Sequence, residues 1–145
     1  MRGLHGPLLD FPPLWRERKS RERGRTFLKS ERIDMLLETL VRELNLKVSC
    51  AEGNLKREVK GGYVGDLLSD VMANSKEGDI WITRQVHQNI VAVASLKDLA
   101  GIILIQGSEP ANDTAAKANA EGIPILVTDL PAFEIVGLIY KLIKP

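Results

Sequence analysis

The sequence has 145 residues, of which 44% are hydrophobic and 27% charged, and it contains a single cysteine, Cys50. This length fits one domain with a tail, and the composition excludes a chain-wide disordered, collagen-like or disulfide-stapled protein. One cysteine excludes an internal disulfide and a cysteine-based zinc site, so we expect no metal and no cofactor. A free thiol suits a reducing cytoplasm. No apolar run approaches the ~20 residues that span a bilayer, and we expect neither membrane association nor a signal peptide.

The formal net charge of +1 conceals an uneven distribution. Residues 1–32 contain nine Lys and Arg and four Asp and Glu, a net charge of +5, whereas the remaining residues carry a net charge of −4. Because residues 1–32 cannot bury a continuous apolar face, we expect a disordered N-terminal extension before a domain at residues 33–145. The extension could contact nucleic acid or another polyanion, be a solvated tail, or precede a true start near Met35. The acidic domain makes nucleic acid the least favoured of these.

The first half of the domain mixes helical and strand patterns. Apolar periodicity predicts a helix over residues 31–45, capped by Ser30, and then a strand over residues 46–50. In that strand Leu46, Val48 and Cys50 would share one face. Residues 51–54 are typical of a turn, and residues 55–59 of a second strand or an extended link. A glycine pair then predicts a break, followed by a helix over residues 63–71.

The second half alternates strands and helices regularly. Strands are predicted at residues 79–84, 101–106 and 124–128, and helices at residues 89–99, 111–121 and 131–143. The strands are apolar at almost every position, which is typical of strands covered on both faces. The alternation therefore indicates an α/β fold with a parallel sheet between two layers of helices.

Polar side chains follow the three apolar strands. Ligands in open α/β sheets bind beyond the carboxyl ends of the strands, so these side chains predict the rim of a binding pocket. The candidate ligand-binding residues of this group are Thr83, Gln85, His87, Asn89, Gln106 and Thr128. The alternative is structural, with Asn89, Ser108 or Asp129 as helix caps and Pro131 in a first helical turn.

A second group of candidates surrounds the glycine pair. Gly61 and Gly62 could let the backbone approach a ligand phosphate, or they could form a tight turn that needs positive φ. Asp66 and Asp70 would share one face of a helix and could bind a cation or a hydroxylated ligand. Alternatively, Asp66 favours the helix dipole and Asp70 is solvated. Together with His87 these carboxylates also allow a small enzyme, although no nucleophile motif or metal-ligand set accompanies them.

Two blocks of sequence resemble the DRTGG domain family. They are Arg-Glu-Val-Lys-Gly-Gly-Tyr at residues 57–63 and Gly-Asp-Leu-Leu-Ser-Asp-Val-Met-Ala at residues 65–73. Residues 78–83, 87–94 and 122–126 resemble it as well, so the likeness runs from about residue 33 to residue 145. The sequence departs from the family pattern at Lys56 and Lys60, where the pattern has aspartate and threonine.

The resemblance implies a three-layer α/β/α module with a mostly parallel sheet, similar to the N-terminal domain of HPr kinase/phosphorylase. It also implies a regulatory, homodimeric module rather than a catalytic one, with a nucleotide, a metabolite or a partner protein as what it recognises. The chain has no GxxxxGK[ST] phosphate loop, so we expect no kinase activity.

Overall fold

The computed structural model describes residues 34–144. The predictions for the N-terminal extension, the Ser30 cap and the first residues of the first helix lie outside this range. The described elements, in chain order, are α3 (Leu37–Glu43), β1 (Lys47–Cys50), the 3-10 helix η2 (Glu52–Asn54), β2 (Gly61–Val64), α4 (Leu68–Asn74), β3 (Asp79–Thr83), α5 (Asn89–Leu96), β4 (Gly101–Leu104), α6 (Asn112–Glu121), β5 (Ile125–Val127) and α7 (Ala132–Ile143). No helix of this range is long and apolar enough to cross a membrane.

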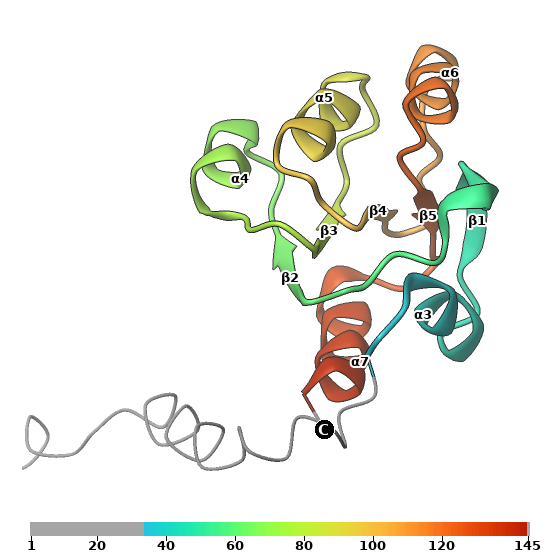
Figure 1. Cartoon of the computed structure of the whole chain (residues 1–145), viewed down its shortest axis with the longest axis vertical. Helices are drawn as coiled ribbons and strands as arrows, with labels where there is room; N and C mark the ends of the chain where they lie inside the picture. Colours follow the sequence, from blue (N-terminus) through green and yellow to red (C-terminus); the bar gives the residue numbers. More distant parts are fainter. Residues whose placement is uncertain (1–33, 145) are drawn as a thin grey trace, which may run out of the picture. The chain divides into compact units, whose positions relative to one another are not determined.

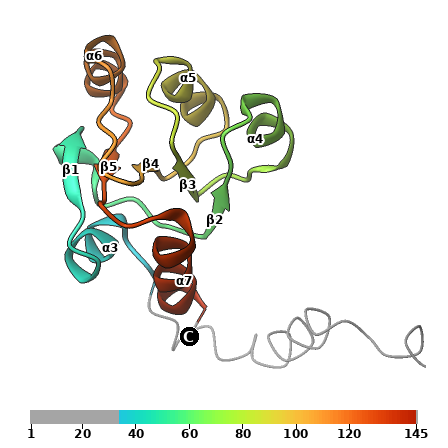
Figure 2. The same ribbon diagram turned by 180° about the vertical axis from the view of Figure 1, so that it is seen from behind.

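The five strands form one sheet in the order β1-β5-β4-β3-β2. Strands β2, β3, β4 and β5 are parallel, and β1 runs antiparallel to β5 at one edge. Helices α4, α5 and α6 cover one face of the sheet, while α3 and α7 cover the other (Figures 1 and 2). The predicted three-layer α/β/α architecture with a mostly parallel sheet is therefore confirmed.

The core consists of two apolar layers, one on each face of the sheet. Successive strand side chains point to opposite faces, so Trp81 packs in the layer under α4, α5 and α6, whereas Ile80 and Ile82 pack in the layer under α3 and α7. Every residue of β3, β4 and β5 is buried. Their continuous apolar sequences thus reflect helices on both faces, as the sequence indicates.

A β-bulge makes one sequence expectation wrong. Val48 lies opposite Leu126. Two residues further along β1, Cys50 lies opposite Ile125, which is only one residue away from Leu126, so the register shifts between Val48 and Cys50. An extra residue at a bulge changes the face to which the following side chains point. Val48 therefore packs in the layer under α3 and α7, and Cys50 packs in the other layer. Burial raises the pKa of the Cys50 thiol above its ordinary value.

The glycine pair lies in a strand, not in the break that the sequence predicts. Gly61 and Gly62 begin β2, the edge strand that pairs with β3, and neither has positive φ. A Cβ atom at Gly61 would lie 2.9 Å from Oδ1 of Asp79, so the close approach of that carboxylate, rather than a turn, requires glycine there. Helix α4 consequently begins only at Leu68, after Asp66.

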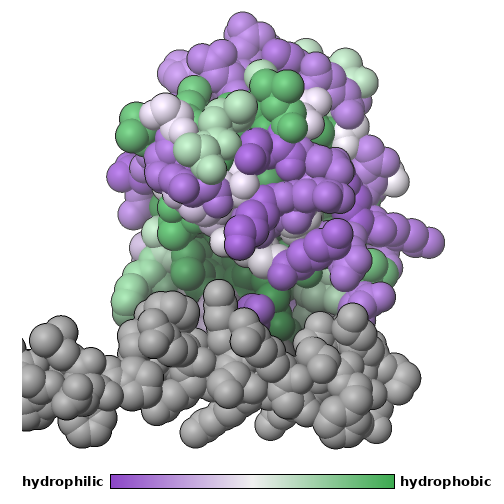
Figure 3. Space-filling model, turned by 60° about the vertical axis from the view of Figure 1, so that its left-hand side comes forward, coloured by the Kyte–Doolittle hydropathy of each residue, from purple (hydrophilic) through white to green (hydrophobic). Residues whose placement is uncertain are grey.

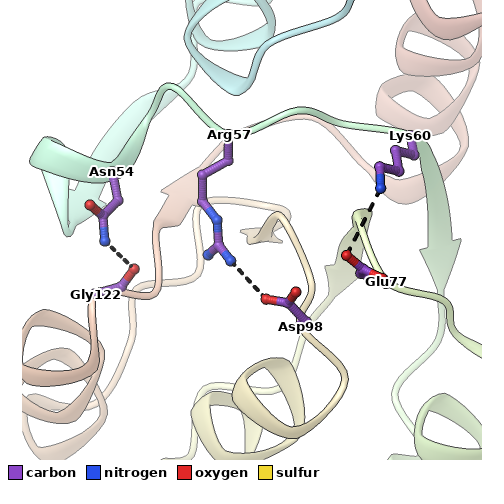
Figure 4. A network of polar contacts seen from close by, with 6 residues as sticks. All are labelled: Asn54, Arg57, Lys60, Glu77, Asp98 and Gly122. Atoms are coloured by element: carbon purple, nitrogen blue, oxygen red, sulfur yellow. Dashed lines mark hydrogen bonds and ion pairs between the residues drawn. The ribbon is translucent and has the colours of Figure 1, made fainter.

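Residues 51–60 connect β1 at one edge of the sheet to β2 at the other and cross the amino ends of the strands between them (Figure 4). Asn54 Nδ2 donates to the carbonyl of Gly122, 2.7 Å away, before β5. Arg57 pairs with Asp98 before β4 at 3.2 Å, and Lys60 with Glu77 before β3 at 3.9 Å. Of the two predicted alternatives this is the extended link, since residues 55–59 form no strand of the sheet and only Glu58 makes an isolated bridge, with Leu36.

Candidate functional site

Asp66 joins the turn after β2 to the turn after β3. Its Oδ1 accepts hydrogen bonds from Oγ1 of Thr83 and from the backbone N–H of Arg84, both at 2.8 Å. Gln85 Nε2 donates to the backbone carbonyl of Asp66 at 3.1 Å. Three predicted site residues, Asp66, Thr83 and Gln85, are thus brought together. Their polar groups bond to one another, and Thr83 is buried.

Gln106 and Thr128 belong to a second network, which joins the turns after β4 and β5. The backbone N–H of Gln106 donates to the carbonyl of Leu130 at 3.1 Å, and the N–H of Leu130 donates to Oγ1 of Thr128 at 3.2 Å. The N–H of Gly107 donates to the carbonyl of Thr128 at 2.9 Å. Within residues 34–144 no side-chain hydrogen bond links this network to the one around Asp66.

His87 and Asn89 are exposed side chains in and beside the loop between β3 and α5. The predicted N-cap role of Asn89 is wrong, because Gln88 is the N-cap and Asn89 is the first helical residue. The caps predicted at Ser108 and Asp129 are wrong for the same reason, since Ala111 and Pro131 occupy those N-cap positions. At the carboxyl ends of the strands, the side chains of Asp66, Thr83, Gln85 and Thr128 thus form hydrogen bonds within the protein, whereas His87 and Asn89 are exposed.

The expectation that Asp66 and Asp70 share a helix face is also wrong. Asp70 lies within α4 and accepts from the hydroxyl of Tyr63 at 2.5 Å and from Nδ2 of Asn74 at 2.8 Å. These two donors hold the pKa of Asp70 below its ordinary value. The hydrogen bond between Tyr63 and Asp70 also raises the pKa of Tyr63. In the part of the chain that the structure describes, no cluster of three His, Cys, Asp or Glu could hold a metal ion.

A hollow of about 420 Å³ lies beside β2, between the free edge of the sheet and α7. Its apolar floor consists of Ile82, Val136, Ile139 and Ile143. Two predicted site residues, Gly61 and Gly62, line it, although the other candidates do not. Figure 3 looks onto this side of the molecule, where a recessed hydrophobic area lies below and beside hydrophilic residues.

Gly62 leaves space on the α7 side of β2. It lies opposite Ile80, on the α7 side of the sheet, and a Cβ atom there would meet Ile80 at 3.5 Å and Ile82 at 4.0 Å. These are ordinary van der Waals distances, so the position has room for a side chain. Because glycine has none, no side chain at this position of β2 fills the space toward α7.

Among the described residues, three lysines and one carboxylate line the hollow. Lys60, Lys76 and Lys144 come from the segment before β2, the loop after α4 and the end of α7. Asp79 is buried and its Oδ2 accepts from the backbone N–H of Lys76 at 2.8 Å. The hollow thus combines an apolar floor with a net positive margin. These lysines could not be predicted as neighbours because they are scattered along the chain, and the glycine pair is the part of the hollow that the sequence singles out.

The DRTGG domain family model matches residues 39–142. The chain belongs to the DRTGG domain family. No curated protein matches it. Among solved structures, the CBS and DRTGG domains of the regulatory region of Clostridium perfringens pyrophosphatase, complexed with its activator diadenosine tetraphosphate, are similar to this DRTGG domain at 20% sequence identity and a TM-score of 0.59. The likeness covers 72% of this chain and 45% of that one, so the DRTGG domain spans less than half of that regulatory region.

Proposed function

We propose that this DRTGG domain is a non-catalytic regulatory module that forms a homodimer and binds a small ligand of the nucleotide class. Family membership supports a regulatory role, and the similar structure is a regulatory region complexed with a dinucleotide activator. That region also contains CBS domains, so the choice of a nucleotide for this chain is part of the proposal.

The exposed face of α7 carries the homodimer proposal. Leu138 is 41% exposed, and beside it Gly137 has no atom within 4 Å of where a Cβ would lie. Glycine in an exposed helix interior costs about 1 kcal/mol relative to alanine. Because Gly137 has no side chain, a second helix could approach α7 closely there.

The same face is complementary to itself. In a two-fold dimer each copy uses the same surface, and two antiparallel α7 helices centred between Gly137 and Leu138 would place each leucine beside the other copy's glycine. Glu134 and Lys141 lie at equal distances from that centre, so each carboxylate would face an ammonium group of the second copy. Opposite charges at matched positions favour this register over a parallel one.

Light scattering coupled to size exclusion tests the dimer on the full chain. We expect a dimer at micromolar concentration, and Leu138→Asp is expected to give a monomer. Leu96→Asp is the matched control, because Leu96 is a 74% exposed leucine on α5, on the opposite face of the sheet. A strict monomer for the unmodified protein, or equal dissociation by both variants, contradicts the proposal.

Thermal unfolding tests the ligand. A nucleotide that binds only the folded state stabilises it by about 2.7 kcal/mol at 100 times its dissociation constant, so ATP and dinucleotides are expected to raise the melting temperature of the full chain. If the domain dimerises but no nucleotide raises it, the nucleotide part of the proposal is wrong and a partner protein becomes the better candidate.

A further inference from the structure

Gly62 has no conformational reason to be glycine. Its φ is not positive, and a Cβ atom would make only ordinary contacts with Ile80 and Ile82. Glycine inside a strand is destabilising, and it often marks a place where a ligand or another backbone approaches closely. A side chain at this position would fill part of the hollow, whereas glycine leaves that part open.

The hollow has the size and the floor of a small-molecule site. Its volume of about 420 Å³ lies within the ~300–1,000 Å³ typical of ligand pockets. Ile82, Val136 and Ile139 provide an apolar surface, and Tyr140 adds an aromatic ring to the wall. Such a surface suits a flat, weakly polar group such as a nucleobase.

The margin of the hollow suits an anion. Lys76 and Lys144 form no ion pair with any residue in 34–144, and Lys60 has only the long contact with Glu77, in which both side chains are more than half exposed. An exposed pair of this kind contributes little and is easily exchanged. Asp79, the carboxylate that lines the hollow among residues 34–144, already accepts a backbone hydrogen bond. Three lysines from separate segments thus face one shared space, where phosphate oxygens would bind them well.

We propose that this hollow is the nucleotide site, with the base over the apolar floor beside Gly62 and the phosphates at Lys60, Lys76 and Lys144. This inference rests on the proposed ligand binding and gives it a location. The site lies at the free edge of β2, away from the carboxyl ends of the strands where the polar sequence motifs fall.

Isothermal titration of the full chain with ATP tests the site. Adenosine and tripolyphosphate, each carrying half of the recognition, are expected to bind at least about tenfold more weakly than ATP. Gly62→Val places a β-branched side chain, which strands favour, into the hollow and is expected to weaken ATP binding at least about tenfold. Its matched control is Gly53→Val, because Gly53 is exposed and has no atom near its Cβ position.

The margin is tested separately. Lys76→Glu keeps an exposed side chain and should fold, and it is expected to weaken ATP binding about tenfold, whereas Lys117→Glu on α6 is expected to leave it unchanged. Residues 1–32 carry a net charge of +5 and remain in every variant. ATP binding that survives both Gly62→Val and Lys76→Glu therefore lies elsewhere, which overturns this site but keeps the proposed ligand. A chain that binds neither ATP nor a dinucleotide overturns both the site and the proposed ligand.

Discussion

Two regions of the molecule differ in how far their polar side chains bond within the protein. One is the edge formed by the carboxyl ends of the strands, the carboxyl edge, and the other is the hollow beside β2. At the carboxyl edge, Asp66 accepts hydrogen bonds from the hydroxyl of Thr83 and the N–H of Arg84, and the hydroxyl of Thr128 accepts one from the N–H of Leu130. Beside β2 an apolar floor lies open under three lysines. Polar residues after a strand show only that hydrogen bonds are needed there, and the structure shows whether the protein itself supplies them.

The largest expected effect comes from removing the anchor of the carboxyl edge. Trp81 is fully buried, and its Nε1 donates to the carbonyl of Gly65 at 2.9 Å. Trp81→Ala should lower the free energy of unfolding by about 3–5 kcal/mol, as large-to-small core substitutions do, in urea unfolding followed by circular dichroism. A cost below about 1 kcal/mol would mean that this edge is not held as described.

Asp66→Ala sharpens the comparison directly. It leaves the buried hydroxyl of Thr83 and the N–H of Arg84 without their acceptor, which should cost about 1–3 kcal/mol of unfolding free energy. The affinity for ATP should not change. Asp129→Ala is the control, because Asp129 is exposed after β5 and its side chain accepts no hydrogen bond from the described residues. Unchanged stability with lost ATP binding would make the carboxyl edge the site.

The two adjacent glycines of β2 should respond in opposite ways. Gly61→Ala places a methyl group 2.9 Å from Oδ1 of Asp79, and such overpacking costs about 1–3 kcal/mol. Gly62→Ala meets only ordinary contacts and should be neutral or stabilising by about 0.5 kcal/mol, because alanine has less freedom to lose than glycine. Equal effects on chemical unfolding would show that Gly62 is also constrained by the backbone and not by the hollow.

The smallest effect is on the pH dependence of stability. The pKa of Asp70 is lowered by the Tyr63 and Asn74 hydrogen bonds, so the stability from this carboxylate is present above its ordinary pKa of 3.8 and is lost as the pH falls through its folded value. The pKa of Tyr63 is raised from 10.0, so the part due to its hydroxyl is present below pH 10 and is lost as the pH rises further.

Asp70→Asn should remove both dependences. The measurement is the free energy of unfolding of the two proteins between acidic and alkaline pH, and the difference between them should shrink at each extreme. A difference that stays constant across the whole range would show that the Tyr63–Asp70 hydrogen bond does not form in solution.

Most of the architecture follows from the sequence, and its failures have physical causes. The apolar strands 79–84 and 101–106 could be predicted because their pattern reflects burial on both faces. The bulge at Ser49 could not, because one extra residue changes a face without changing the composition. Strand β2 could not either, since Gly61 and Gly62 signal a break locally and pairing with β3 overrides that preference.

The candidate site was predicted least well. Thr83 and Gln85 were expected to share a pocket rim with Gln106 and Thr128, and Asp66 to lie with Asp70; the structure instead joins Asp66 to Thr83 and Gln85, whose polar groups bond to one another. Gly61 and Gly62 were predicted to let the backbone approach a ligand phosphate or to form a tight turn. In the structure they line the hollow, where Gly62 has no side chain to fill it. A missing side chain and lysines far apart in the chain carry no local pattern, so only the topology brings them together.

Nuclear magnetic resonance of the full chain, titrated with ATP, tests the central claim most directly. The amide signals of both regions are read in one experiment. The account predicts that the signals of residues 60–64, 76 and 136–144 shift, and that Gly62→Val abolishes these shifts. Shifts centred on residues 83–89, 106 and 128 instead, or no saturable shift anywhere, would contradict it.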